Sequence, residues 1–159
     1  MRAGRLLAAS ALLFAASPAA ADAVPWPSGI YSNVRMSGRT GDLGGMEARF
    51  YEEAGQPMVE FVWCEGWCNE TFKVPVTRAD GGFAFSYFQR YADGGADAGV
   101  IMRFLAQPIG NRLRIAAWQG EQRLDYGGKP QVLKRAKRPF GITVANGEKD
   151  EDVNPSLSP

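Results

Sequence analysis

The stretch Phe83-Ala84-Phe85-Ser86-Tyr87 decides the fold class, because large aromatic side chains alternate in it with small ones. A period of two places the three rings on one face of a β-strand and the small residues on the other. The same period recurs in Leu113-Arg114-Ile115 and in Met102-Arg103-Phe104. These stretches predict β-strands with one buried face.

Runs of strand length that are rich in aromatic and β-branched residues extend outward from this stretch in both directions. They are Ile30–Met36, Met46–Glu52, Met58–Cys64, Thr71–Thr77, Phe83–Tyr91, Val100–Ala106, Arg112–Trp118 and Gln131–Arg135. Clusters of Gly, Asp, Asn and Pro separate them and are typical of tight turns. About eight short strands predict an all-β protein, a single antiparallel up-and-down β-barrel over residues 26–141. Closure removes the sheet edges that promote aggregation; a two-sheet sandwich is the alternative.

The N-terminal segment is typical of a secretory signal peptide. A short positive start, Met1–Arg5, precedes an apolar run of 11 residues and small residues that end in an Ala-x-Ala site. Because about 20 apolar residues are needed to cross a bilayer, we expect residues 1–21 to be removed and no transmembrane segment to remain. Cleavage after Ala21 or Ala23 would leave a periplasmic or secreted protein, in a compartment where disulfides persist.

Composition narrows the classes of function. Removal of residues 1–21 leaves 138 of the 159 residues, a length that suits one domain, and we expect a monomer. Arg2 and Arg5 are removed with the signal peptide, so the mature chain contains 16 basic and 17 acidic residues. A near-neutral chain of this kind gives no support for nucleic-acid binding.

The chain contains no histidine. Without it there is no Ser-His-Asp triad, no Cys-His pair and no His-ligated zinc or copper site. Carboxylate pairs, Lys or Tyr would need shifted pKa values that a sequence does not reveal. We therefore expect a protein that is not an enzyme, with no catalytic residues, no cofactor and no metal.

The segment Trp63-Cys64-Glu65-Gly66-Trp67-Cys68 is the most unusual local sequence. In an oxidising compartment its two cysteines predict a disulfide that pins a hairpin tip. A thioredoxin-like redox centre and a Cu(I) site made of the two thiolates are the alternatives. Trp63, Glu65 and Trp67 would then be rigid contact residues for a partner, unless the tryptophans pack into the end of the barrel.

A second candidate binding region is basic. Lys134, Arg135, Lys137 and Arg138 follow one another closely and could contact an anionic lipid, a polysaccharide or a peptide. Alternatively they form a solvated strand end that protects a sheet edge. The polar segment 142–159 is expected to be a disordered tail.

Two motifs carry a resemblance to known proteins. Ser28-Gly-Ile-Tyr-Ser-Asn33 followed by Thr40-Gly-Asp-Leu-Gly-Gly-Met-Glu47 resembles a family of small exported bacterial β proteins without an assigned function. The resemblance implies a shared fold and export, and no functional residue. Gly29-Ile30-Tyr31 together with Arg135 is similar, more weakly, to the G-x-W opening and late Arg of lipocalin and calycin barrels, which implies that Arg135 packs on Tyr31.

Taken together, these features favour a non-enzymatic binding module that recognises an unknown protein or cell-envelope polymer through the disulfide-pinned aromatic tip. The alternative is a calycin-like carrier that holds a small apolar ligand inside the barrel. The residues that would line its cavity are Phe83, Phe85, Tyr87, Met102 and Phe104. A purely structural envelope protein is a third possibility.

Overall fold

The computed structural model describes residues 24–91, 98–124 and 129–147 of the chain. The predicted signal peptide lies outside these residues. The strands are β1 (Gly29–Ser32), β2 (Arg35–Met36), β3 (Leu43–Glu53), β4 (Gln56–Gly66), β5 (Thr71–Pro75), β6 (Thr77–Ala79), β7 (Gly82–Arg90), β8 (Gly99–Ile109), β9 (Arg112–Gln119), β10 (Gln122–Leu124) and β11 (Gln131–Ala136), and one helix follows them, α1 (Gly141–Ala145). Each run predicted from the sequence coincides with one or two of these strands.

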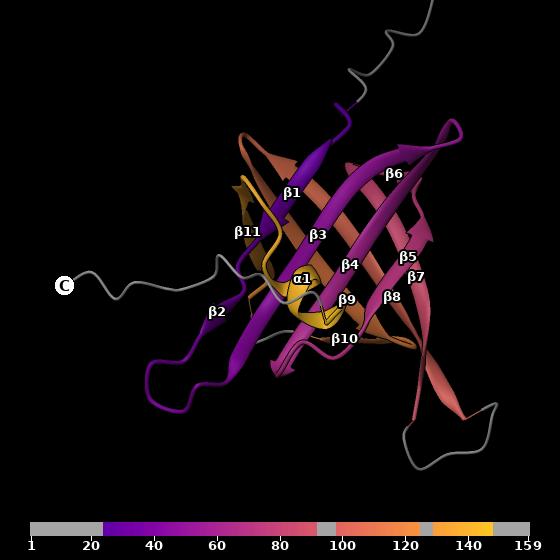
Figure 1. Cartoon of the computed structure of the whole chain (residues 1–159). Helices are drawn as coiled ribbons and strands as arrows, with labels where there is room; N and C mark the ends of the chain where they lie inside the picture. Colours follow the sequence, from indigo (N-terminus) through magenta and orange to yellow (C-terminus); the bar gives the residue numbers. More distant parts are fainter. Residues whose placement is uncertain (1–23, 92–97, 125–128, 148–159) are drawn as a thin grey trace, which may run out of the picture.

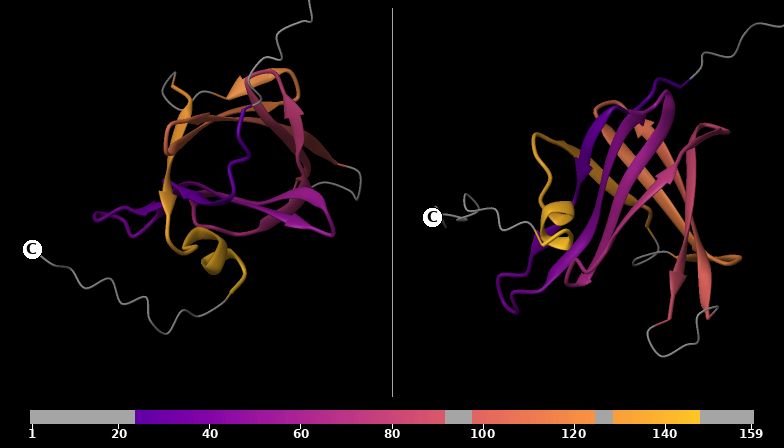
Figure 2. Two further views of the ribbon diagram at one scale, coloured as in Figure 1. Left: turned by 90° about the horizontal axis from the view of Figure 1, so that it is seen from above. Right: turned by 45° about the vertical axis from the view of Figure 1, so that its right-hand side comes forward.

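The strands form one antiparallel sheet with the order β5-β4-β3-β1-β11-β9-β8-β7-β6. The sheet curls into a nearly closed barrel, seen end-on in Figure 2, in which β1 pairs with β11. On the other side, β5 pairs with β4, while β6 pairs with the first residues of β7. The prediction of an up-and-down β-barrel is therefore confirmed.

The change of partner between β5 and β6 leaves a seam in the wall. Val76 lies at the change, buried, with its N–H donating to the carbonyl of Pro57 at 2.9 Å. Beyond it, no strand in the described chain pairs with the second half of β7 on this side. Instead the rings of Phe72 and Tyr87 bridge the seam, stacked with centroids 3.6 Å apart.

The barrel interior is packed with aromatic rings. Phe85 stacks on Phe104 at 4.9 Å between centroids, and Phe61 lies 4.6 Å from Phe104. Alternation of the strands directs these side chains inward, and a barrel of about eight strands is just wide enough for them. The five residues that a carrier would use to line a cavity are buried in this one cluster.

One end of the barrel, called the plugged end here, is covered by the segment that precedes β1. The ring of Trp26 makes edge contacts with Phe50 at 5.6 Å and with Phe83 at 5.2 Å. Arg78 holds this segment by donating from Nη1 to the carbonyl of Val24 at 2.9 Å. Trp26 thus occupies the space between the inward side chains at this end.

Arg135 lies at the plugged end as well. Its guanidinium carbon is 5.7 Å from the ring centroid of Tyr31, and its Nη1 lies 3.5 Å from the Tyr31 hydroxyl. Gly29 has φ +100°, and a Cβ there would lie 3.0 Å from this guanidinium. Arg135 therefore packs on Tyr31 at this end of the barrel.

Helix α1 lies on the outer face of the barrel, across β3 and β4 (Figure 1). Ile142 is buried there in a second apolar cluster with Leu43, Val62 and the two cysteines. The folded domain consequently extends beyond the predicted start of the tail at residue 142. Composition hid this extension because the apolar residues that anchor it, Ile142 with Phe140, Val144 and Ala145 packed beside it, form a short stretch before a polar segment. Residues 148–159 of the predicted tail lie outside the described residues.

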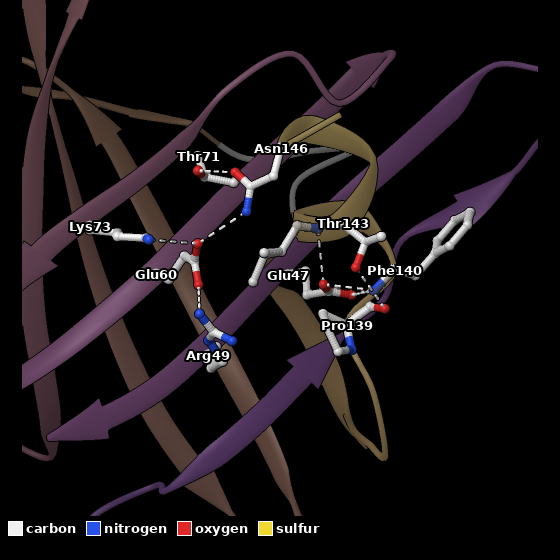
Figure 3. A network of polar contacts seen from close by, with 10 residues as sticks. Glu47, Arg49, Glu60, Thr71, Lys73, Pro139, Phe140, Thr143 and Asn146 are labelled. Atoms are coloured by element: carbon white, nitrogen blue, oxygen red, sulfur yellow. Dashed lines mark hydrogen bonds and ion pairs between the residues drawn. The ribbon is translucent and has the colours of Figure 1, made fainter. Parts of the chain in front are cut away.

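Two buried carboxylates fix α1 and the outer face of β4 (Figure 3). Glu47 is fully buried and accepts hydrogen bonds from the N–H of Phe140 and, at 3.1 Å, from that of Ile142. Glu60 pairs with Arg49 and lies 3.6 Å from the Nζ of Lys73. Both carboxylates therefore have structural partners, as buried charges require.

Residues of the motifs Ser28–Asn33 and Thr40–Glu47 connect neighbouring strands through hydrogen bonds. The Asn33 amide accepts from the N–H of Met46 at 2.7 Å and donates to Gln131 Oε1 at 2.7 Å. Gly45 has φ +121°, and a Cβ there would lie 2.7 Å from the Asn33 side-chain oxygen. A glycine is therefore required beside this asparagine, and the motifs are explained by packing.

Candidate functional site

The predicted disulfide is present, with 2.02 Å between the sulfurs of Cys64 and Cys68. Both residues are almost completely buried, with exposed fractions of 2% and 1%, in the outer cluster beneath α1. Between them, the N–H of Glu65 donates to the carbonyl of Trp67 at 3.0 Å and Gly66 has φ +79°. The disulfide fixes the shape of this loop, and its sulfurs face the protein.

The two tryptophans beside the disulfide have different environments. Trp63 is half-buried, and its ring lies inside the barrel end, 6.2 Å from the centroid of Phe104. Trp67 is 51% exposed, and Glu65 is exposed beside it. Of the aromatic pair predicted to contact a partner, Trp67 therefore lies on the outer surface and Trp63 faces the barrel interior.

The predicted basic residues lie at the opposite end of the molecule from this loop. Arg135 packs on Tyr31 at the plugged end, and Lys137 and Arg138 are exposed beyond the end of β11. Lys134 faces outward from the same strand, where it pairs with Ser32 in register. The structure thus does not bring the two predicted groups together into one site.

A cavity of about 760 Å³ occupies the end of the barrel that carries the disulfide loop, called the open end here. Its floor consists of Trp63, Phe72, Tyr87 and Met102, which are half-buried or buried side chains from four strands. The seam between β5 and β7 forms one side. Its rim is made by Glu65, Asn69, Glu70, Gln89, Arg90, Tyr91, Gln119, Gln122, Arg123 and Leu124.

The hydroxyl of Tyr87 belongs to the floor of this cavity. Burial, with a smaller contribution from the charge of Glu70, raises the pKa of Tyr87 above its ordinary value. The described chain contains no buried side-chain oxygen that lacks a hydrogen-bond partner, and the Tyr87 hydroxyl makes no hydrogen bond to a described residue. The hydroxyl therefore reaches the cavity as a neutral donor.

The rim carries polar groups with no partner among the described residues. Within residues 24–91, 98–124 and 129–147, no hydrogen bond or ion pair engages the side chains of Asn69, Glu70, Gln89, Gln119 and Gln122. An amide offers both donors and an acceptor. These side chains are available to a ligand.

A second cavity of about 910 Å³ lies beside the first, between the β2–β3 connection and the end of β4. Some of its polar residues bond to one another, whereas the side chains of Arg35, Arg39 and Asp42 make no hydrogen bond or ion pair to a described residue. Asn33 bonds to Gln131, the Ser37 hydroxyl accepts from the N–H of Thr40, and the Thr40 hydroxyl accepts from that of Asp42. Trp63 is the single aromatic residue of its lining, so this cavity lacks an aromatic floor and is the weaker candidate.

Exposed apolar side chains gather around the open end. Among the described residues, seven large hydrophobic side chains are exposed, and all but Ile109 lie in the open-end half of their strand or just beyond its end there. The six are Met36, Trp67, Phe88, Tyr91, Ile101 and Val132.

The sequence analysis missed most of this cavity, although a signal for it was present. The inward series of β7 runs from Phe83 through Tyr87 to Gln89, and that of β9 runs through Ala117 to Gln119. A polar residue that ends an apolar inward series marks the point where the barrel interior meets water. Both glutamines lie on the rim.

Within the described parts of the chain, no helix is long and apolar enough to cross a membrane, and no group of three or more potential metal ligands occurs. In comparisons with known proteins, no family model, no curated protein and no solved structure matches this chain.

Proposed function

We propose that this protein is an exported, non-enzymatic binding module that takes a protein or envelope polymer at the open end of its barrel. The observation that carries the proposal is the cavity of about 760 Å³, which lies within the ~300–1,000 Å³ typical of ligand sites. It combines an aromatic floor with polar side chains that have no partner in the described protein. At the plugged end, the ring of Trp26 fills the corresponding space between Phe50 and Phe83.

The disulfide loop supports this site from one side. Glu65 belongs to the cavity wall, and Trp67 is exposed next to it. Because the link between Cys64 and Cys68 fixes the loop, little conformational entropy is lost when a partner binds. Trp67 and the exposed apolar residues around the open end would extend the contact surface beyond the cavity.

The packed interior favours this module over the carrier. Phe61, Phe85 and Phe104 fill the space that an enclosed apolar ligand would need. A ligand can enter only as far as Trp63 and Tyr87, so it remains partly exposed. That depth suits a projecting group of a larger partner.

The predicted signal peptide and the disulfide together support an oxidising location, periplasmic or extracellular. The partner is therefore sought among envelope components.

The test compares two equivalent substitutions at opposite ends. Gln89→Trp places a bulky ring at the cavity rim, and Gln56→Trp places one on the exposed first residue of β4 at the plugged end. Binding to purified envelope fractions, labelled and titrated separately, is expected to weaken at least about tenfold in Gln89→Trp, since about 1.4 kcal/mol is lost. Gln56→Trp is expected to bind like the natural protein. Equal binding by both variants would refute the open end as the site.

A further inference from the structure

The cavity contains chemistry that identifies a class of ligand. Resting on the proposed function, we infer that the open-end cavity binds a neutral oligosaccharide segment of an envelope polymer. The juxtaposition behind this inference is an aromatic floor with a circle of amide side chains above it.

The charges of the cavity balance. Glu65 and Glu70 contribute two carboxylates to its lining, and Arg90 and Arg123 contribute two guanidinium groups. A site for an anionic or cationic polymer would carry an excess of the opposite charge. The described lining has none, so it favours a ligand without net charge.

The hydrogen-bonding groups match hydroxyl groups. Asn69, Gln89, Gln119 and Gln122 each provide donors and an acceptor, and a sugar hydroxyl also donates and accepts. These amides come from the segment before β5 and from β7, β9 and β10, so they surround the cavity on several sides. A polyhydroxylated ligand can use all of them at once, whatever the direction of each hydroxyl.

The floor provides apolar contact from below. The rings of Trp63 and Phe72 are half-buried, so part of each remains open to the cavity. The C–H face of a sugar ring is apolar and packs on an aromatic face, while its hydroxyls point sideways toward the amides. Tyr87, only 8% exposed, adds a hydroxyl that no described residue engages.

A peptide segment is the principal competitor. It would bind most readily by adding a strand to a free sheet edge. At the seam, the stacked rings of Phe72 and Tyr87 cover the place where such a strand would pair with β7. The observations therefore favour the saccharide.

The experiment measures ligand binding to the disulfide-bonded protein by saturation-transfer NMR and by titration. The probes are cellotetraose and chitotetraose, tetragalacturonate as an anionic control, and an uncharged Gly/Ser/Asn hexapeptide. We expect at least one neutral tetrasaccharide to bind, with an affinity that changes less than about twofold between about 50 and about 500 mM NaCl, since no charge is involved.

Variants locate the binding. The double variant Gln89→Ala with Gln119→Ala is expected to weaken binding at least about tenfold, because several hydrogen bonds are lost. The matched control, Gln56→Ala, changes an exposed glutamine at the plugged end and is expected to bind normally. All three side chains are exposed, so the variants should fold, and circular dichroism with denaturant titration checks this.

The outcomes separate the two proposals. Binding of the hexapeptide or tetragalacturonate in place of the neutral saccharides would overturn the ligand class and leave the open end as the binding site. Saccharide binding that survives the double variant would overturn the ligand class at this site. If no probe binds and Gln89→Trp also leaves binding of every envelope fraction unchanged, both proposals fail.

Discussion

The two ends of this barrel are built from the same alternating strands and yet differ in how they meet water. At the plugged end, Trp26 folds back between Phe50 and Phe83, and Arg135 covers Tyr31. At the open end, none of the described residues outside the strands inserts a ring in this way, and inward positions are taken by glutamine. The comparison teaches that a packed core and a binding cavity can share one short barrel, provided that one end completes the core.

The largest difference in stability between the two ends is expected for a pair of tryptophan substitutions, one at each end. Trp26→Ala removes a ring that contacts two core phenylalanines, so we expect the free energy of unfolding to fall by about 2–3 kcal/mol. Trp67→Ala removes a 51% exposed ring and should change it by less than about 0.5 kcal/mol. Urea titration measures both. Equal losses would mean that the two ends contribute alike to the core.

A smaller effect is expected in the pH dependence of stability, which reports how far the Tyr87 hydroxyl on the cavity floor is hydrated. Burial raises the pKa of Tyr87, with Glu70 adding to the shift, so the folded protein keeps this proton after the unfolded chain has lost it. Below pH ~10 both states are protonated, and this group adds no pH dependence. Above it, stability should fall with pH, by up to about 1.4 kcal/mol per unit.

The matched variant for this effect is Tyr87→Phe. It lacks the ionisable group, so its unfolding free energy should fall less steeply than that of the natural protein above pH ~10. Unfolding titrations at several alkaline pH values measure the two slopes. Identical slopes would indicate that the Tyr87 hydroxyl is hydrated like one in bulk water, and the floor would then be wet.

The smallest effect is expected for the basic residues beyond β11. Lys137→Ala combined with Arg138→Ala alters two exposed side chains at the plugged end. We expect stability to change by no more than about 0.5 kcal/mol per substitution and ligand affinity to stay the same. A loss of ligand binding in this variant would place recognition at the plugged end and contradict the proposed open-end site.

The sequence predicts most of the fold because each strand carries its own period. The alternation in Phe83–Tyr87 indicates which side chains face inward, whatever surrounds them. The disulfide between Cys64 and Cys68 is also predictable, since the two cysteines are close in sequence. Local patterns of this kind do not depend on distant partners.

The site depends on distant partners and was therefore harder to predict. Trp63 and Trp67 each precede a cysteine, yet Trp63 faces inward from β4, while Trp67 follows the turn at Gly66 and is exposed. Phe72 and Tyr87 meet because β5 and β6 pair with different neighbours. A seam of this kind arises from the closure of the sheet and leaves no mark in either segment alone.

The pairing of β1 with β11 has a consequence for how the chain matures. These two strands lie about a hundred residues apart in sequence, and their ladder, Ile30 with Ala136 through Ser32 with Lys134, closes the sheet on that side. A polypeptide interrupted anywhere before β11 leaves the β1 edge unpaired, and bare edges recruit other chains. Fragments that lack β11 are therefore expected to aggregate and to be cleaved by proteases. A chain that includes β11 pairs this edge and avoids both.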